Sequence, residues 1–357
     1  MGKRKRNGLR RGAGELAAGM ALAFGLGLAA REALAQDDDP SLAGQVALVT
    51  GGSRGLGLAI GRELARQGCR LAICARDEEA LATARADLER LGAEVLTVPC
   101  DVSDRAQVTA TVDTVTRHFG RIDILINNAG IIVVAPVETL TQDDFARVMA
   151  VDFWGTVNPT LAVLPGMRER RAGRIVNVTS IGGKLAVPHL LPYSCAKFAA
   201  VGFSEGLRAE LAGTGITVTT VVPGLMRTGS HLHAEFGGDQ EAEYRWFALN
   251  ASAPYPVTAG AARAARLVVR AMTRGQAECT FPLTALLAGR FVGLFPGAGA
   301  SVLALVDRLL PNPPPRPTDL LPGAAVAAEI DSPFLDAAMT LGQKAAEEFN
   351  QVPTPAG

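Results

Sequence analysis

Tyr193 and Lys197 stand four residues apart at the start of an apolar, alanine-rich run over residues 198–211. On a helix this spacing places both side chains on one face, one turn apart. A phenol has an ordinary pKa near ~10, so it exchanges protons poorly at neutral pH unless a neighbouring charge stabilises its phenolate. The Lys197 ammonium would supply that charge and move the pKa of Tyr193 toward the working pH.

Ser180 is a third residue that could take part in this chemistry. It follows an apolar run over residues 174–179, which is typical of a buried strand, and the glycines at 182–183 let the chain turn back. Its hydroxyl could polarise a substrate carbonyl beside the phenol of Tyr193. A Tyr-x-x-x-Lys pattern alone is weak, because such pairs are common on solvated helix faces, so the surrounding elements have to decide.

Strands and helices alternate from residue 45 onward, because short apolar runs are separated by amphipathic segments. The predicted strands cover residues 45–50, 70–75, 94–100, 122–126, 174–179, 216–222 and 277–281. The predicted helices include 58–66, 78–91, 104–119, 141–170 and 259–273, with Pro159 and Pro165 kinking or ending the long one. This alternation predicts an α/β fold, a Rossmann-type doubly wound parallel sheet of about seven strands with helices on both faces.

The candidate functional residues all follow the ends of predicted strands, where ligands bind in such sheets. After the first strand comes a glycine-rich loop, residues 50–57, which allows a tight turn and brings a pyrophosphate close to a helix N-terminus. The other strand ends carry Ala75-Arg76, Cys100-Asp101, Asn127 to Gly130, Ser180 and Pro223-Gly224.

These motifs, in this order, resemble the short-chain dehydrogenase/reductase family across residues 41–281. The resemblance implies one Rossmann domain with a substrate lid at residues 228–250, and it implies that Ser180, Tyr193 and Lys197 are catalytic. It also implies a set of cofactor-binding residues: Gly51, Ser53, Arg54, Gly55, Leu56, Gly57, Arg76, Asp101, Val102, Asn128, Tyr193, Lys197, Pro223, Gly224 and Thr228.

The end of the second strand indicates which cofactor binds. A carboxylate at this position holds the ribose hydroxyls of NAD and would repel a 2′-phosphate. Here Ala75 is followed by Arg76, and Arg54 in the glycine-rich loop adds a second cation on the same side. Two guanidinium groups suit a phosphate dianion, which predicts NADP(H), as does the resemblance. Asp77 is predicted to cap the helix over residues 78–91.

Asp152 departs from the family pattern. The resemblance implies Asn at this place in the long helix, where its backbone holds a water in a proton relay with the lysine. Asp152 could join the catalytic set, in which case its carboxylate would raise the pKa of Lys197. Alternatively, it only hydrogen-bonds neighbouring backbone.

The resemblance implies hydride transfer between nicotinamide and a carbonyl or secondary alcohol. Ser180 would bind the carbonyl oxygen and Tyr193 would donate the proton. Aromatic residues in the lid favour an apolar ketone or aldehyde: Phe236, Tyr244, Trp246 and Phe247. The alternative is a catalytically idle NADP(H)-binding sensor or scaffold, which only the Asp152 departure supports.

The composition restricts the partners. The 357 residues carry zero formal net charge, and the five cysteines show no pair spacing. Neither feature indicates a nucleic acid or a metal ion, so no metal site is predicted. The predicted partner is a small carbonyl or alcohol substrate, while a membrane surface and a second copy of the chain remain open.

Residues 1–40 form a separate segment in which basic residues precede a nearly uncharged run from Leu16 to Ala30. It could be a cleaved export signal, a short membrane anchor or a soluble helix. We expect membrane association through residues 12–35, with the side of the membrane open and a cytoplasmic or exported protein as the alternatives.

Residues 282–357 form an apolar extension and tail. The apolar run over residues 283–310 is interrupted at 289–290 and 295–297, which predicts several short pieces. This run could pad the sheet, cover the pocket, contact a partner subunit or lie on a membrane. One amphipathic helix is predicted over residues 333–349.

Overall fold

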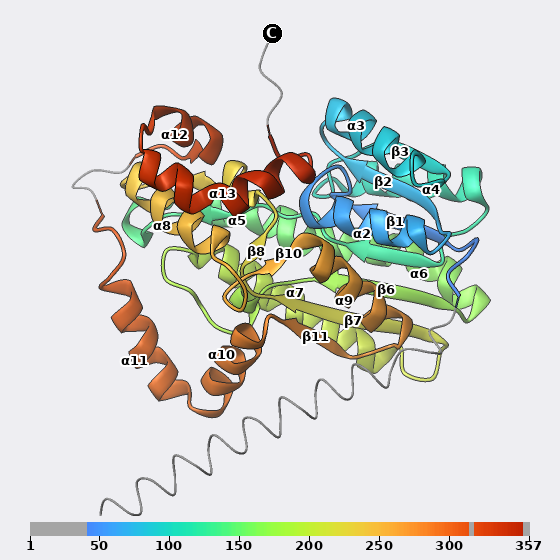
Figure 1. Cartoon of the computed structure of the whole chain (residues 1–357). Coiled ribbons are helices and arrows are strands. Elements are labelled where there is room, and N and C mark those ends of the chain that lie inside the picture. Colours follow the sequence, from blue (N-terminus) through green and yellow to red (C-terminus); the bar gives the residue numbers. More distant parts are fainter. Residues whose placement is uncertain (1–40, 314–317, 353–357) are drawn as a thin grey trace, which may run out of the picture. The chain divides into compact units, whose positions relative to one another are not determined.

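Seven short strands form the central sheet of the chain, which we describe from a computed structural model over residues 41–313 and 318–352 (Figure 1). They are β1 (Val46–Thr50), β2 (Arg70–Ala75), β3 (Val95–Pro99), β4 (Ile124–Asn127), β6 (Gly173–Val178), β7 (Ile216–Pro223) and β11 (Glu278–Phe281). Their order is β11-β7-β6-β4-β1-β2-β3, and every pairing is parallel. The predicted Rossmann-type sheet is therefore confirmed. The predicted segment 1–40 lies outside the described residues.

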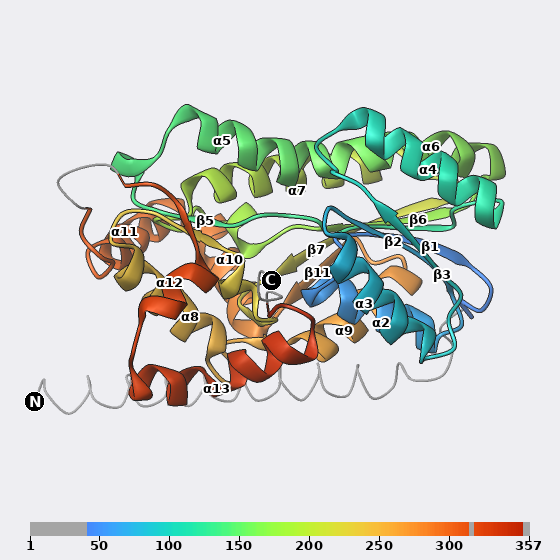
Figure 2. The same ribbon diagram turned by 90° about the horizontal axis from the view of Figure 1, so that it is seen from above.

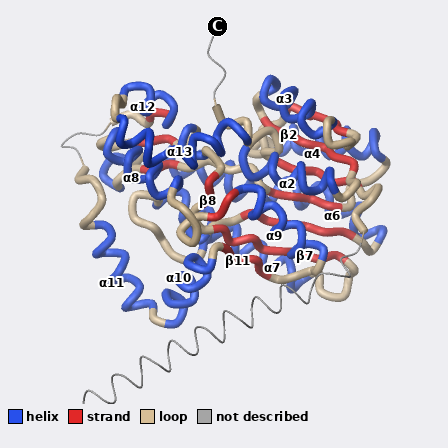
Figure 3. Tube along the Cα trace, viewed as in Figure 1, coloured by secondary structure: helices blue, strands red, loops and turns tan. Residues whose placement is uncertain are grey.

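Helices cover both faces of this sheet (Figures 2 and 3). On one face lie α2 (Gly55–Arg66), α3 (Glu78–Glu89) and α9 (Ala261–Thr273), and on the other α4 (Arg105–Phe119), α6 (Gly155–Arg170) and α7 (Leu191–Glu210). Strand β1 shows the cause, because Ala47 and Val49 join one apolar cluster whereas Val46 and Leu48 join the other. Side chains that alternate along a strand need cover on both sides.

The predicted long helix over residues 141–170 is divided into three parts. They are α5 (Gln142–Val148), a π-helical turn over Met149–Trp154, and α6. Both Pro159 and Pro165 lie inside α6, so the prediction that they end the helix is wrong. The irregularity falls earlier, at the π turn, which changes the direction of the side chains that follow and contains Asp152.

The last part of the chain after Phe281 folds against the lid. It forms α10 (Leu283–Leu294), α11 (Pro296–Asp307), β12 (Leu321–Pro322), α12 (Gly323–Glu329) and α13 (Pro333–Glu348). The predicted break at residues 289–290 is absent from α10, because a helix tolerates isolated internal glycines, and the chain turns at Phe295. Within the described ranges, no helix combines the length and the apolarity that a bilayer crossing requires.

Two small sheets complete the lid. Strand β12 pairs with β9 (Glu235–Phe236), which pairs in turn with β5 (Val133–Val134), while β8 (Met226–Arg227) pairs with β10 (Ala259–Gly260). Lid helix α8 (Gln240–Ser252) packs on α13. Buried side chains from both parts form one cluster: Phe236, Tyr244, Phe247, Val326, Leu335 and Met339. The lid and the extension therefore share a core.

Candidate active site

The glycine-rich loop between β1 and α2 is fastened to the turn after β4. The Thr50 hydroxyl accepts hydrogen bonds from the amides of Asn128 (3.0 Å) and Ala129 (3.1 Å). The Asn128 side chain donates to the carbonyls of Thr50 (3.1 Å) and Gly51 (3.2 Å). A Cβ on Gly57 would lie 2.2 Å from the Gly51 carbonyl oxygen, so only glycine allows this close approach.

This loop offers the N-terminus of α2 to a negatively charged group. Arg54 precedes the helix without a capping side-chain hydrogen bond, and the first turn contains no acidic residue. The first amides of a helix lack intrahelical partners and carry a partial positive charge. The amides of Leu56 and Gly57 therefore suit the pyrophosphate of a dinucleotide.

Ser180 and Tyr193 meet around Gly182. Ser180 follows β6, and its hydroxyl accepts a hydrogen bond of 3.0 Å from the Gly182 amide. A Cβ on Gly182 would lie 3.3 Å from Tyr193 Cε1 and 3.4 Å from Ser180 Oγ. Helix α7 then places Lys197 one turn after Tyr193, with its Nζ 5.5 Å from the centre of the Tyr193 ring. The structure thus brings together the three residues that the sequence nominates.

Asp152 forms a buried ion pair with Lys197. The Lys197 Nζ lies 3.1 Å from Asp152 Oδ2, and the other carboxylate oxygen accepts a hydrogen bond of 2.7 Å from the Ile131 amide. The side chains of Asp152 and Lys197 are 0% and 5% exposed. The interpretation in which Asp152 bonds only neighbouring backbone is wrong, because the carboxylate reaches the lysine.

Burial and the charges within this cluster together shift the pKa values of Tyr193 and Lys197. Burial raises the pKa of Tyr193, and the nearby Lys197 ammonium offsets only part of this increase, to which the Asp152 carboxylate adds. The sequence predicts a shift of the Tyr193 pKa toward the working pH; the structure gives the opposite direction. Burial acts to lower the pKa of Lys197, but the charges of Asp152 and Tyr193 outweigh it and raise that pKa. Tyr193 is therefore a neutral hydroxyl, and its burial makes it a weaker acid than a free phenol.

The two arginines predicted to bind a 2′-phosphate have different surroundings. Arg54 Nη2 lies 2.8 Å from Asp77 Oδ2, and its Nη1 lies 3.1 Å from His233 Nδ1. Arg76 is exposed and has no ion pair with any residue that the structure describes. Asp77 also accepts a hydrogen bond from the Ala80 amide and caps α3, as predicted. Arg54 is thus already partly neutralised, contrary to the expectation of two free guanidinium groups.

The remaining predicted cofactor residues line the same edge of the sheet. Asp101 accepts hydrogen bonds from Ser103, and the Val102 carbonyl accepts one of 3.2 Å from Asn158. Gly224 follows β7 and donates to the Phe281 carbonyl, and Thr228 is buried. The Thr228 Cβ lies 4.0 Å from the position of a Cβ on Gly55, so the segment after β7 meets the glycine-rich loop.

Sequence reasoning assigned no partner to His189. Its Nδ1 donates a hydrogen bond of 2.6 Å to Glu243 Oε1, and the two side chains are only 9% and 1% exposed. His189 lies between Ser180 and Tyr193 with a φ of 61°, while Glu243 lies on lid helix α8. Because Glu243 resembles any polar residue of a surface helix, no local signal could have identified this contact.

A cavity of about 300 Å³ lies between the lid and the extension. Its lining includes Tyr244, Leu335, Met339 and His231, but neither Ser180 nor Tyr193. Burial lowers the pKa of His231 to about 4, with a smaller contribution from His233, so His231 is neutral. His231 thus faces this cavity, and His233 binds Arg54.

The comparisons with known proteins agree with this site. Residues 45–235 match the short chain dehydrogenase family. The chain is 42% identical over 186 residues to a Streptomyces coelicolor protein named as a ketoacyl reductase. The aligned region covers 52% of this chain and 71% of that protein. It is 36% identical over 249 residues to a Mycobacterium tuberculosis protein named as the oxidoreductase SadH. This second aligned region covers 69% of this chain and 88% of that protein.

A solved structure shows the same fold. It is a short-chain dehydrogenase/reductase from Burkholderia phymatum in complex with NAD, with a TM-score of 0.66 and 26% identity over 78% of this chain and 100% of that one. Members of this family bind a nicotinamide cofactor, and the loop and strand ends described above have the form that such a cofactor needs. This chain therefore belongs to the short-chain dehydrogenase/reductase family of oxidoreductases.

Proposed function

We propose that the protein is an NADP(H)-dependent oxidoreductase that interconverts an apolar ketone or aldehyde and the corresponding alcohol. The observation that carries this proposal is the arrangement of Ser180, Tyr193 and Lys197 at the carboxyl edge of the sheet. Ser180 and Tyr193 meet around Gly182, and the lysine is held by Asp152 at 3.1 Å. An idle binding protein would have no use for this arrangement.

The residues divide the reduction between them. When bound, the reduced nicotinamide supplies a hydride to the carbonyl carbon. The Ser180 hydroxyl donates a hydrogen bond to the carbonyl oxygen, and the Tyr193 hydroxyl transfers its proton to that same oxygen. The Lys197 ammonium stabilises the phenolate that this transfer leaves on Tyr193. In the oxidation of an alcohol, the phenolate takes the proton back.

Arg76 supports NADP(H) as the cofactor. Its exposed guanidinium follows β2, where Ala75 replaces the carboxylate that would repel a 2′-phosphate. Arg54 adds a second cation, although Asp77 shares its charge. Because the Burkholderia phymatum structure contains NAD, the family alone leaves the choice of cofactor open.

Three of the four lid aromatics that favour an apolar substrate in the sequence are used for packing instead, so this preference rests on a relative. Phe236, Tyr244 and Phe247 of the lid are buried in one cluster with the C-terminal extension. The Streptomyces coelicolor relative is named as a ketoacyl reductase, which is compatible with a ketone attached to a longer chain.

Consumption of NADPH and NADH against a panel of apolar ketones and aldehydes tests this function. We expect Tyr193→Phe to lower turnover by roughly 10²–10⁴-fold, because the ring remains but the proton donor is lost, while NADPH still binds. We expect Arg76→Ala to weaken NADPH binding by about 1.5–3 kcal/mol, as for a hydrogen bond to a charged group, and to affect NADH much less. Near-normal turnover by the Tyr193 variant would show that Tyr193 is not the proton donor. An equal loss of affinity for NADPH and NADH would show that Arg76 does not bind the 2′-phosphate.

A further inference from the structure

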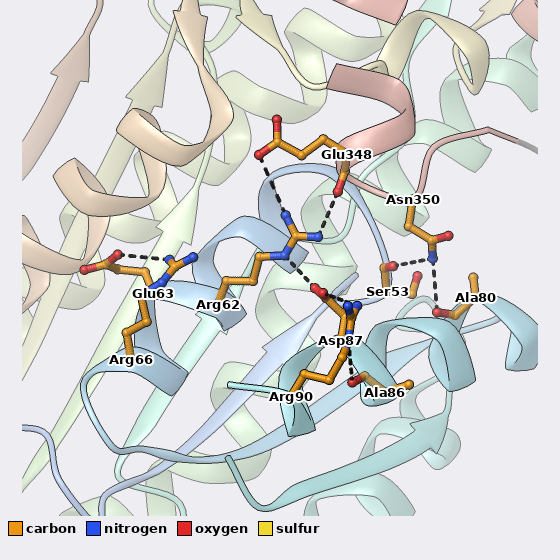
Figure 4. Close-up of polar contacts among 10 residues, drawn as sticks. All are labelled: Ser53, Arg62, Glu63, Arg66, Ala80, Ala86, Asp87, Arg90, Glu348 and Asn350. Atoms are coloured by element: carbon orange, nitrogen blue, oxygen red, sulfur yellow. Dashed lines mark hydrogen bonds and ion pairs between the residues drawn. The ribbon is translucent and has the colours of Figure 1, made fainter. Parts of the chain in front are cut away.

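The last residue of α13 and the three residues that follow it lie beside the glycine-rich loop and α2. We call Glu348, Phe349, Asn350 and Gln351 the clasp. Figure 4 shows Asn350 between Ser53 and the first turn of α3, with Glu348 beside Arg62 of α2. The nearest residues of the cofactor loop are almost three hundred positions earlier in the chain.

The clasp supplies the cap that α2 lacks. The Gly55 amide, at the first position of α2, donates a hydrogen bond of 2.8 Å to the Phe349 carbonyl. The preceding Arg54 makes no capping side-chain bond. A helix N-terminus needs acceptors for its free amides, and this one receives an acceptor from the far end of the chain. The amides of Leu56 and Gly57 then remain for a phosphate.

Asn350 ties together two walls of the cofactor site. Its side-chain amide donates to the Ser53 carbonyl (3.0 Å) and to the Ala80 carbonyl (3.2 Å). Ser53 belongs to the glycine-rich loop, and Ala80 belongs to the first turn of α3, directly after Arg76 and Asp77. Asn350 has a φ of 54°, a conformation that asparagine tolerates better than most residues. Its geometry fixes the distance between the two segments that would bind the adenosine end of a dinucleotide.

Phe349 anchors the clasp. Its side chain is 3% exposed and joins the apolar cluster that includes Leu56 and Ile60 of α2. The Arg62 guanidinium lies 5.1 Å from the centre of the ring and donates a hydrogen bond of 2.8 Å to the Glu348 carbonyl. Arg62 also pairs with Asp87 of α3. These contacts fix the clasp to the two helices that border the loop.

Gln351 connects the clasp to Arg54. The Gln351 carbonyl accepts a hydrogen bond of 2.8 Å from His233 Nε2. Nδ1 of the neutral ring can then accept from Arg54 Nη1 at 3.1 Å, although the same Nη1 lies 2.9 Å from Nε2. Burial lowers the pKa of His233, with a smaller effect of the Arg54 charge, and favours this neutral form. The side chain of Arg54 is therefore held from two sides, by Asp77 and through His233 by the clasp.

We infer that the clasp positions the glycine-rich loop for cofactor binding, with Asn350 as its main positioning residue. This inference rests on the nicotinamide cofactor of the proposed function. It assigns to the end of the extension, which lies beyond the residues that match the family, a direct part in the affinity for that cofactor. Catalytic groups at the other end of the site are not involved.

Titration of the purified full-length protein with NADPH and with NADH, without substrate, tests the clasp. Asn350→Gly permits the same backbone conformation and removes the two side-chain hydrogen bonds, while the added backbone freedom of glycine is matched in the control below. We expect the Kd for both cofactors to rise about three- to tenfold, the factor that corresponds to a net hydrogen bond of ordinary strength. At saturating cofactor, kcat should stay within about twofold, since no group near Tyr193 changes.

Arg171→Gly is the matched control, because Arg171 is exposed, has a φ of 52° and lies just before β6, at the opposite edge of the sheet. It should leave both Kd values unchanged. A chain that ends at Glu348 should bind more weakly than Asn350→Gly, whereas a chain that ends at Val352 should bind like the full protein. If the Asn350→Gly variant binds the cofactors as tightly as the wild-type protein, or more tightly, the inference is overturned.

Amide hydrogen exchange over residues 51–57 separates this inference from the proposed function. Faster exchange in Asn350→Gly, together with weaker binding of either cofactor, supports the clasp whichever substrate is reduced. Unchanged exchange overturns it. If the wild-type protein binds neither cofactor, both the proposed function and the positioning role of the clasp fail. If both cofactors bind but no carbonyl is reduced, only the function fails.

Discussion

At the residue scale, Asp152 and Lys197 determine how readily Tyr193 gives up its proton. Burial of the phenol raises its pKa most, the Lys197 ammonium lowers it, and the Asp152 carboxylate 3.1 Å from Lys197 raises it further. An asparagine at position 152 would keep the hydrogen bond from the Ile131 amide and remove the negative charge. The Asp152 charge therefore acts on the pKa of Tyr193 in the direction opposite to that of Lys197.

This arrangement predicts the effect of Asp152→Asn on pH dependence. The Asp152 charge raises the pKa of Tyr193, so its removal should lower that pKa. Alcohol oxidation needs the phenolate, and its rate increases as pH rises through the pKa of Tyr193. We therefore expect the rising limb of the profile of kcat/KM for oxidation to move to lower pH in the variant.

Initial rates of oxidation measured across neutral and alkaline pH in constant ionic strength check this shift. Tyr193→Phe, which should show no such limb, is the control. A limb that moves to higher pH, or does not move, would show that the Asp152 charge does not reach the phenol.

At the scale of elements, a buried hydrogen bond links the lid to the loop before α7. His189 of the loop before α7 donates to Glu243 of α8 at 2.6 Å, and the Glu243 Oε2 has no hydrogen-bond partner among the described residues. The remaining contacts between α8 and its surroundings are largely apolar and involve α13. This pair therefore adds a polar link to the β5–β9 pairing and the apolar packing that also hold the lid.

Replacement of Glu243 tests this attachment. We expect Glu243→Ala to lower the free energy of unfolding by about 1–3 kcal/mol, because His189 keeps a buried donor without an acceptor. We also expect the KM for the carbonyl substrate to increase, since the lid loses its link to the catalytic loop. Urea unfolding and initial-rate measurements provide the two values.

Glu243→Gln is the conservative control, since its amide oxygen can still accept from His189 Nδ1. It should stay closer to the unchanged protein than Glu243→Ala does, both in stability and in KM. Identical behaviour of the two variants would mean that the hydrogen bond does not hold the lid.

At the scale of the whole molecule, helices α10 and α11 expose an apolar surface. Leu283, Leu287, Phe291 and Leu294 recur at intervals of three or four residues along α10, and between 42% and 73% of each residue is exposed. Leu305 of α11 is 58% exposed, and Leu309, which lies after the end of α11, is 75% exposed. Such a surface is larger than scattered apolar residues explain and suits the interface of a lipid bilayer.

We predict that the protein associates with membranes through residues 12–35, assisted by this surface. The nearly uncharged run in the N-terminal segment and the exposed leucines provide two separate apolar contacts in one chain. A single weak anchor gives only marginal binding, so two contacts should act together. Cells that express the full chain, a chain that begins at Asp37, and the full chain with Leu287→Glu and Leu294→Glu should be fractionated.

The full chain should be enriched in the membrane fraction. Removal of the N-terminal segment should shift most of the protein to the soluble fraction, and the double substitution should shift a smaller part. Equal distribution of all three into the soluble fraction would leave residues 12–35 as a soluble helix, without an anchoring or export role.

Much of the fold could be predicted from local patterns. Apolar runs such as residues 46–50 become strands because residues that alternate between two buried faces must all be apolar. The spacing of Tyr193 and Lys197 fixes their common face, since helical geometry is local. For the same reason the cap at Asp77 was predictable from the residues next to it.

Contacts between distant segments were decided only by the tertiary structure. The pair of Asp152 and Lys197 depends on a π turn packing against α7, and the direction of the Tyr193 pKa depends on the burial that this packing creates. The contact of Asn350 with Ser53 depends on the path of α13 across the lid. A sequence pattern records the preferences of neighbouring residues, whereas desolvation and long-range pairing depend on which surfaces finally meet. The sequence by itself therefore determined the sheet and the reactive residues, and packing decided their charges and the partners that hold them.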